Sequence, residues 1–194
     1  MCNFADDNTL YACDISLRNL IEKLESSASS VINWFEYNYM KLNDSKCNLL
    51  VCGKKEEVIV AKIGNSSIVE AHEVKLLGIT IDRELKFKSH LTSICKKAGK
   101  KINALARLCK FLPLHKRIIV MKAFFMSQFS FSPLLLMFCD RALNSKIDSL
   151  HYRALKIVYR DILSSFDELL TKDKSVRVHH RNIQCLAIEM FKLK

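Results

Sequence analysis

The spacing of the hydrophobic residues divides the chain into helix-like and strand-like stretches. Over residues 17–35 an apolar side chain recurs every three or four positions, which is the period of an amphipathic helix, and Asp14 is placed to cap it. The same period returns over residues 91–109. Strand-like runs rich in β-branched and aliphatic residues lie between these helices, at residues 47–52, 58–63, 67–69 and 74–81. These runs predict a small antiparallel sheet or meander.

The C-terminal half has a helical pattern throughout. A helix is predicted to begin near Pro113 and to run through a phenylalanine-rich stretch until Pro133 breaks or kinks it. Further helices are predicted at residues 143–159, 166–170 and 178–193. The second of these follows a capping box formed by Ser165 and Glu168.

These patterns predict an α+β fold in two regions. The first, residues 1–85, combines a long helix with a small antiparallel sheet, and the second, residues 86–194, is mostly helical. A hydrophobic fraction of 49% with only 4 Gly and 2 Pro argues against disorder. The most apolar segment, residues 123–139, is interrupted by serines, a glutamine and a proline, so it is expected to be core and not a membrane span.

The cysteines indicate a reducing compartment. Eight are scattered along the chain without a secretory signal before them or the paired spacing of a zinc site: Cys2, Cys13, Cys47, Cys52, Cys95, Cys109, Cys139 and Cys185. We expect free, mostly buried thiols in an intracellular protein, cytoplasmic or nuclear and not secreted. The closest pair, Cys47 and Cys52, has no second pair or nearby histidine, which disfavours a metal site.

The formal net charge of +11 is concentrated in one segment. Between Leu85 and Cys139 there is no Asp or Glu, and there are 11 bases: Lys86, Lys88, Lys96, Lys97, Lys100, Lys101, Arg107, Lys110, Lys116, Arg117 and Lys122. The rest of the chain has 20 bases and 20 acids. A segment with one sign of charge is typical of a surface that binds a polyanion through its phosphates. A solvated helix face is the alternative, and acidic lipid is a weaker one.

An aspartate pair near the N-terminus suggests catalytic chemistry. In Phe4-Ala5-Asp6-Asp7, apolar residues flank two adjacent carboxylates, a composition suited to a β-hairpin with the carboxylates at its tight turn. Nucleotidyl transfer uses such carboxylates to hold two divalent cations about 4 Å apart, and oxygen ligands suit Mg²⁺. An aspartate pair alone also occurs in ordinary solvated turns.

Several further motifs accompany the pair in a fixed order. They lie at residues 33–35, 38–47, 74–82, 107–108, 121–125, 153–159 and 179–184. With Phe4-Ala5-Asp6-Asp7 before them, the chain resembles the C-terminal palm and thumb portion of a non-LTR (LINE-type) retrotransposon reverse transcriptase. The resemblance spans essentially the whole chain. It implies that residues 1–85 form the late part of the palm and residues 86–194 the thumb with the helical region after it.

The resemblance also implies roles for single residues. Asp6 would be a catalytic metal ligand for Mg²⁺ and Asp7 its weaker neighbour at the hairpin turn. Lys46 would lie near the phosphates of the incoming nucleotide. Leu77 and Gly78 would belong to the hairpin that grips the primer, where a glycine permits close approach of the backbone.

The basic helix would follow the backbone of the RNA template and DNA primer through phosphate contacts, without reading bases. Its residues are Lys96, Lys97, Lys100, Lys101, Arg107 and Lys110. The implied partner is therefore nucleic acid and not a membrane.

One departure from the family concerns activity. In the family, a further metal-binding aspartate and the fingers precede this motif, and neither is present before Phe4 in this sequence. We therefore expect a fragment of an RNA-directed DNA polymerase that is inactive alone and depends on a fingers and palm portion supplied in cis or in trans. The alternatives are a nucleic-acid-binding module without catalysis and a decayed element.

The remaining polar and aromatic candidates are expected to be structural. His72, His90, His115 and His151 have no partner at a catalytic or metal-binding spacing, and we interpret them as surface or capping groups. His179 and His180 adjoin two arginines at a predicted helix start, where solvent or a phosphate is the expected contact. Aromatic residues at helical spacing are expected to be mostly core, with base stacking as the alternative: Trp34, Phe35, Tyr37 and Tyr39.

Overall fold

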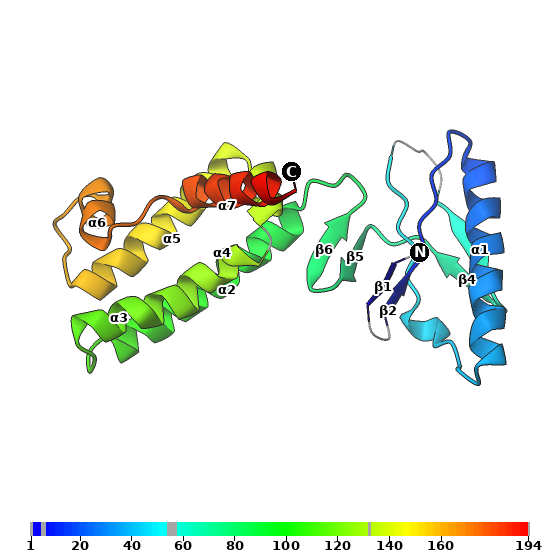
Figure 1. The fold of residues 1–194 in the computed structure, drawn as a ribbon, viewed down its shortest axis with the longest axis horizontal. Helices are drawn as coiled ribbons and strands as arrows, with labels where there is room; N and C mark the ends of the chain where they lie inside the picture. The colour runs from blue at the N-terminus through cyan, green and yellow to red at the C-terminus, as the bar shows by residue number, and fades with distance from the viewer. Residues whose placement is uncertain (1, 5–6, 54–57, 132, 194) are drawn as a thin grey trace. The chain divides into compact units, whose positions relative to one another are not determined.

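The structure is a computed structural model that describes residues 2–4, 7–53, 58–131 and 133–193 (Figure 1). The chain divides into two compact units, Met1–Leu85 and Lys86–Lys194, and each is considered by itself. Strands occur as short antiparallel pairs in the first unit, and helices occur in both, so the fold is α+β as predicted. The identity of the units as palm and thumb stays a prediction.

In the first unit the long helix α1 (Leu17–Tyr37) packs against strand β3 (Val60–Ile63). Strand β3 pairs with β4 (Ser66–Val69) in antiparallel register. The Glu25 carboxylate of α1 accepts a hydrogen bond of 2.7 Å from the backbone N–H of Lys62 and so fixes the helix to the strand. A small core is buried between them: Leu49, Ile59 and Ala61, with Ile21, Leu24, Val51 and Ile68 packed around them.

Helix α1 confirms the predicted long helix, but its start differs. Asp14 does not cap it; the N-cap residue is Ser16, whose side chain makes no capping bond. The Asp14 carboxylate instead accepts a hydrogen bond of 2.9 Å from the backbone N–H of Ser16 and pairs with Lys23. The bond from Lys23 lowers the pKa of Asp14. Because an aspartate can close a local turn onto the residue two positions later, Asp14 stabilises the approach to the helix.

Instead of the small sheet or meander predicted for residues 47–81, the described strands of the first unit form separate antiparallel pairs. These pairs are β1 (Cys2–Phe4) with β2 (Asp7–Thr9), β3 with β4, and β5 (Glu73–Leu76) with β6 (Ile79–Asp82). The strand predicted at residues 47–52 is wrong, because this stretch forms only an isolated bridge between Leu49 and Glu70. Leu49 and Val51 lie in the small core, so packing, and not strand pairing, accounts for their apolar character.

The second unit is a helical assembly, and every helix predicted for it is confirmed. Its elements are α2 (Lys88–Leu108), α3 (Leu114–Met121), the π-helical turn η2 (Lys122–Met126), α4 (Ser127–Ser130), the 3-10 helix η3 (Pro133–Phe138), α5 (Arg141–Tyr159), α6 (Phe166–Asp173) and α7 (Val178–Lys192). Pro133 ends the helical run as predicted, because its ring cannot continue an α-helix. The Ser165–Glu168 capping box is present at the start of α6.

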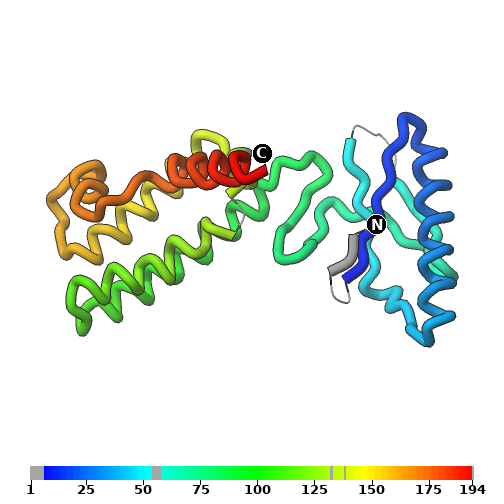
Figure 2. The backbone as a smooth tube through the Cα atoms, in the orientation of Figure 1, coloured from blue at the N-terminus to red at the C-terminus, as the bar shows by residue number. Residues whose placement is uncertain are grey.

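Helices α2 and α5 form the centre of the second unit, where they lie side by side (Figures 1 and 2). Each contributes one apolar stripe, and α6 and the phenylalanines of η2 and α4 cover the stripes. Among the most deeply buried residues are Leu91, Ala98, Ile102, Leu105, Phe125, Phe129, Ala154, Leu155, Val158 and Leu169. This core lies entirely within residues 86–194, so the helical unit has its own hydrophobic interior.

Two expectations about single residues are wrong. His90 and His151 are buried, not on the surface, because both lie on helix faces that turn toward the core. The aromatic residues at the end of α1 are not core: Trp34 is half-exposed, and Tyr37 and Tyr39 are almost fully exposed. The small core of the first unit involves the earlier turns of α1, through Ile21 and Leu24, so the last turn has little to pack against.

Candidate nucleic-acid interface

Helix α2 has one apolar face and one cationic face. Its buried residues, among them Leu91, Ala98 and Ile102, recur at intervals of three and four and point into the core. Lys96, Lys100 and Arg107 are exposed. At 3.6 residues per turn, spacings of four and seven bring these three cations into one row on the outward side of the helix. The amphipathic pattern therefore fixes which way the charges point.

The remaining cations of this helix extend the row. Lys97 is exposed beside it, Lys101 is half-buried on its flank, and Lys110 is exposed just after the last turn of α2. Five of the six predicted nucleic-acid-binding residues thus lie on α2, and the sixth, Lys110, lies in the turn that follows it. We refer to Lys96, Lys97, Lys100, Lys101, Arg107 and Lys110 as the basic face.

The basic face has no counter-charge of its own. In the described part of the chain, none of its six side chains forms an ion pair or hydrogen bond. Some other cations of the unit are paired: Arg177 lies 3.0 Å from both Asp148 and Asp167, and Lys172 pairs with Asp161. Unpaired cations in a row retain their full attraction for an external anion.

The surrounding unit increases this attraction. Residues 86–194 contain 22 basic residues (Lys and Arg) and 7 acidic residues (Asp and Glu), which gives a formal charge of +15. Residues 1–85 contain 9 basic and 13 acidic residues, which gives a formal charge of −4. The positive field therefore belongs to the helical unit. Arg117 is an exception among the eleven bases of the central segment, because it is buried in α3 and cannot contribute to an external surface.

The aspartate pair is only partly described. The hairpin predicted from residues 4–7 is present, with Phe4 opposite Asp7 across β1 and β2, and the Asp7 side chain is exposed. Asp6 lies outside the described residues. Within the described ranges no three His, Cys, Asp or Glu side chains gather as metal ligands would. The described residues do not by themselves make up a magnesium site, and Mg²⁺ stays a prediction.

The other predicted site residues lie in separate turns of the first unit. Lys46 ends the short 3-10 helix η1 (Asp44–Lys46) and is exposed. Leu77 and Gly78 are the two turn residues of the β5–β6 hairpin, both exposed, with φ angles of 46° and 85°. Positive φ at both positions is the geometry of a type I′ hairpin turn. The turn presents its backbone to solvent, as a contact with another molecule requires.

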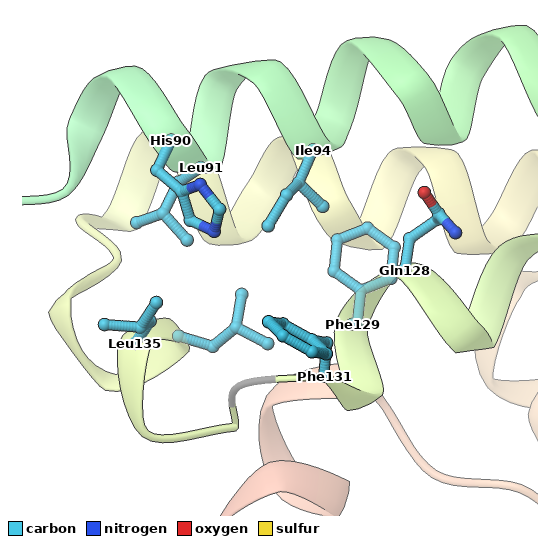
Figure 3. A pocket seen from close by; sticks show the side chains of 8 residues that line it. His90, Leu91, Ile94, Gln128, Phe129, Phe131 and Leu135 are labelled. Carbon is cyan, nitrogen blue, oxygen red and sulfur yellow. The ribbon is translucent and has the colours of Figure 1, made fainter. Parts of the chain in front are cut away.

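Two hollows lie in the helical unit. One, in Figure 3, lies between α2, α4 and η3; it has a volume of about 10 Å³ and is lined by His90, Ile94, Phe129 and other mostly apolar residues. It has room for at most one water molecule. The other is a surface depression of about 410 Å³ along α5, where Arg177 already pairs with two carboxylates. Neither offers a free catalytic group.

The cysteines whose side chains the structure describes are free thiols, but most of them are not buried. All cysteines from Cys13 onward are free, and within the described residues none lies in a cluster of metal ligands. Only Cys95 and Cys109 are buried, although most of the thiols were expected to be. Burial raises the pKa of Cys139 to about 11. No helix among the described residues combines the length and the apolar character that crossing a bilayer requires.

Comparison with protein-family models, curated proteins and solved structures finds no match for this chain. The resemblance to a family therefore stays a prediction from the order of motifs in the sequence, and the candidate interface is identified from the charges and geometry of α2.

Proposed function

We propose that the helical unit binds nucleic acid through the basic face of α2, as the thumb-like part of a non-LTR retrotransposon reverse transcriptase. The observation that carries the proposal is the row of exposed, unpaired cations on one side of a helix whose other side is core. Phosphates along a strand are regularly spaced anions, and a row of lysine and arginine side chains fits such an array.

The contacts would be to the backbone, with little base recognition. The side chains of the row are flexible lysines and one arginine. Asn103, an exposed amide on the same side of α2, already accepts a hydrogen bond of 2.8 Å from the Arg153 guanidinium and is therefore not free to pair with a base edge through its oxygen. Binding of this kind releases counterions, so affinity should fall steeply as salt concentration rises. It should depend weakly on sequence.

The catalytic part of the proposal rests on the aspartate pair and the motif order. Asp6 and Asp7 would contribute carboxylates toward Mg²⁺ in an RNA-directed DNA polymerase, with Lys46 and the Leu77–Gly78 turn near nucleotide and primer. The competing proposal is a binding module without catalysis. Replacing both aspartates with asparagine distinguishes them, because this change should remove metal-dependent activity and leave nucleic-acid affinity in metal-free buffer unchanged.

The binding proposal is tested by reversing charge in the row. The triple variant Lys96→Glu, Lys100→Glu and Arg107→Glu should weaken binding to a labelled short duplex on the order of a hundredfold and reduce the slope of log K against log salt by about 3. Fluorescence anisotropy over a salt series measures both quantities.

A matched control separates location from total charge. Lys41, Lys62 and Lys75 are exposed lysines of the first unit, and reversing all three changes the net charge by the same amount. This control should keep most of the affinity. Equal losses in the two triple variants would mean that only the overall charge of the protein matters, and the proposed interface would be wrong.

A further inference from the structure

The end of the helical unit where α2 passes into α3 carries exposed apolar side chains. Phe111 lies in this turn with 86% of its surface exposed, and Leu108 and Leu114 on either side are also exposed. Cations adjoin the phenylalanine in sequence: Arg107 closes the last turn of α2 and Lys110 precedes the ring. Exposure of an aromatic ring to water is unfavourable in free energy, so an exposed apolar patch of this kind is a candidate binding surface. The cations beside the ring favour a partner that carries negative charge.

A second turn lies at the same end of the unit. The Arg160 guanidinium, just after α5, donates hydrogen bonds of 3.0 and 3.1 Å to the backbone carbonyls of Cys109 and Lys110, and Figure 1 shows the α2–α3 and α5–α6 turns together. Ile162 and Leu163 follow and are largely exposed. We call Leu108, Phe111, Leu114, Ile162 and Leu163 the apolar tip.

Negative charge beside the tip is compensated. Asp161 is the acid within the α5–α6 turn, and its carboxylate accepts hydrogen bonds from Lys172 and from Ser164. These bonds lower the pKa of Asp161 below its ordinary range. Uncompensated charge around the tip is therefore positive, and it is continuous with the basic face through Arg107 and Lys110.

We infer that the basic face takes a nucleic acid with unpaired bases, and that Phe111 stacks on an unpaired base where the row of cations ends. The inference rests on the proposed function and specifies its ligand. Base pairs inside a duplex are covered by their neighbours, so an exposed ring on a protein surface can stack only on a base whose face is free. Cationic grooves combined with aromatic rings are the general means of binding single strands.

The placement of the cations favours a strand over a lipid surface. Lys96 lies roughly 20 Å from Phe111 along the helix axis, at 1.5 Å per residue. A bilayer met by the apolar tip would leave Lys96 and Lys100 in water, because they extend back from the tip along α2. A strand that follows the helix reaches the whole row and places a base at Phe111.

The test uses the full chain, phosphatidylserine vesicles and three labelled DNA probes. The DNA probes are a blunt duplex, the same duplex with a single-stranded overhang, and a single strand carrying a fluorescent base analogue. Phe111→Ala should weaken binding to the overhang and single-strand probes roughly five- to hundredfold and leave blunt-duplex binding within about twofold. Phe111→Tyr, which retains the ring, should restore binding. The base analogue should be quenched by the wild type and by Phe111→Tyr only.

Phe191→Ala is the matched control, since Phe191 is 79% exposed on α7 of the same unit and lies outside the tip. It should behave as the wild type. Thermal unfolding of each variant checks that the fold is retained. Retention is expected because both rings are exposed and lie outside the core.

The other outcomes overturn the inference in distinguishable ways. If Phe111→Ala binds all probes as well as the wild type while charge reversal in the row abolishes binding, the stacking role is wrong and the proposed function stands. If no probe binds with salt dependence, the proposed function fails as well. If Phe111→Ala loses binding only to vesicles of phosphatidylserine, the tip is a lipid contact.

Discussion

His151 is the residue whose surroundings differ most from what its sequence context predicts. Its ring is completely buried in the helical unit, stacked 5.3 Å from the ring of Phe125 and edge-on to that of Phe166 at 5.5 Å. Burial lowers its pKa to about 4, against the opposing influence of Asp173 and Asp148. The imidazole is therefore neutral at physiological pH and acts as part of the core.

This burial predicts a pH-dependent stability. In the unfolded chain the His151 side chain binds a proton at the ordinary histidine pKa of 6.5, whereas in the folded chain it does so only near pH 4. Between these two pH values the unfolded state therefore binds more protons than the folded state. Stability should be complete above pH 6.5 and decline by roughly 3 kcal/mol as pH falls to 4. Chemical denaturation at a series of pH values measures the decline.

The variant His151→Phe isolates the contribution. It keeps an aromatic ring between Phe125 and Phe166 and removes the titrating group, so the free energy of unfolding should become much less dependent on pH between 6.5 and 4. A control at an exposed histidine, His115→Phe, should retain the wild-type decline. An unchanged pH profile in His151→Phe would assign the acid sensitivity to other groups.

Among the elements, α6 is a short helix with an N-terminus that the sequence specifies well. The Ser165 hydroxyl accepts a hydrogen bond of 3.4 Å from the backbone N–H of Glu168, and the Glu168 carboxylate accepts one of 2.8 Å from the backbone N–H of Ser165. These two bonds occupy donors that a helix start otherwise leaves unpaired. They hold α6, and with it Leu169, over the core.

Ser165→Ala should therefore reduce the free energy of unfolding of the helical unit by about 1 kcal/mol. Ser149→Ala is the matched control: Ser149 is exposed in the middle of α5 and donates to the Ser145 carbonyl, an arrangement that contributes little to a helix. It should be neutral or slightly stabilising. Urea denaturation followed by circular dichroism compares the two, and a loss in the control equal to that in Ser165→Ala would contradict the capping role.

For the whole molecule, the two units differ in how much core each contains. The helical unit buries a continuous cluster from Leu91 to Val178, whereas the first unit buries only Leu49, Ile59 and Ala61 in its core cluster of described residues. Stability follows the apolar area removed from water, so the helical unit should be the more stable of the two. The positive charge of the helical unit should also make it, and not the first unit, responsible for the affinity for nucleic acid.

A protein consisting of residues 86–194 should therefore unfold cooperatively and keep the salt-dependent binding of the full chain. Residues 1–85, with a formal charge of −4 and a small core, should bind nucleic acid weakly and show little protection in hydrogen exchange. Scanning calorimetry and anisotropy on the two pieces test this. Failure of the helical piece to unfold cooperatively would show that its core needs the first unit.

The sequence by itself determined most of the helical unit. The three-and-four spacing of apolar residues around α2 and α5, the proline at residue 133 and the Ser165–Glu168 box are local signals, and local signals are sufficient for helices because their hydrogen bonds join residues four apart. The basic face follows from the same period, because the residues that alternate with the core positions must point outward.

Tertiary structure decided what depends on residues distant in sequence. Whether residues 47–52 pair as a strand depends on a neighbouring strand, and the burial of His90 and His151 depends on which elements cover them. The apolar tip is the clearest case, because Arg160 brings Phe111 and Leu163 to one end of the unit although they are far apart in the chain. Periodicity specifies which side of a helix is apolar, but the packing of the whole unit decides which apolar side chains remain uncovered.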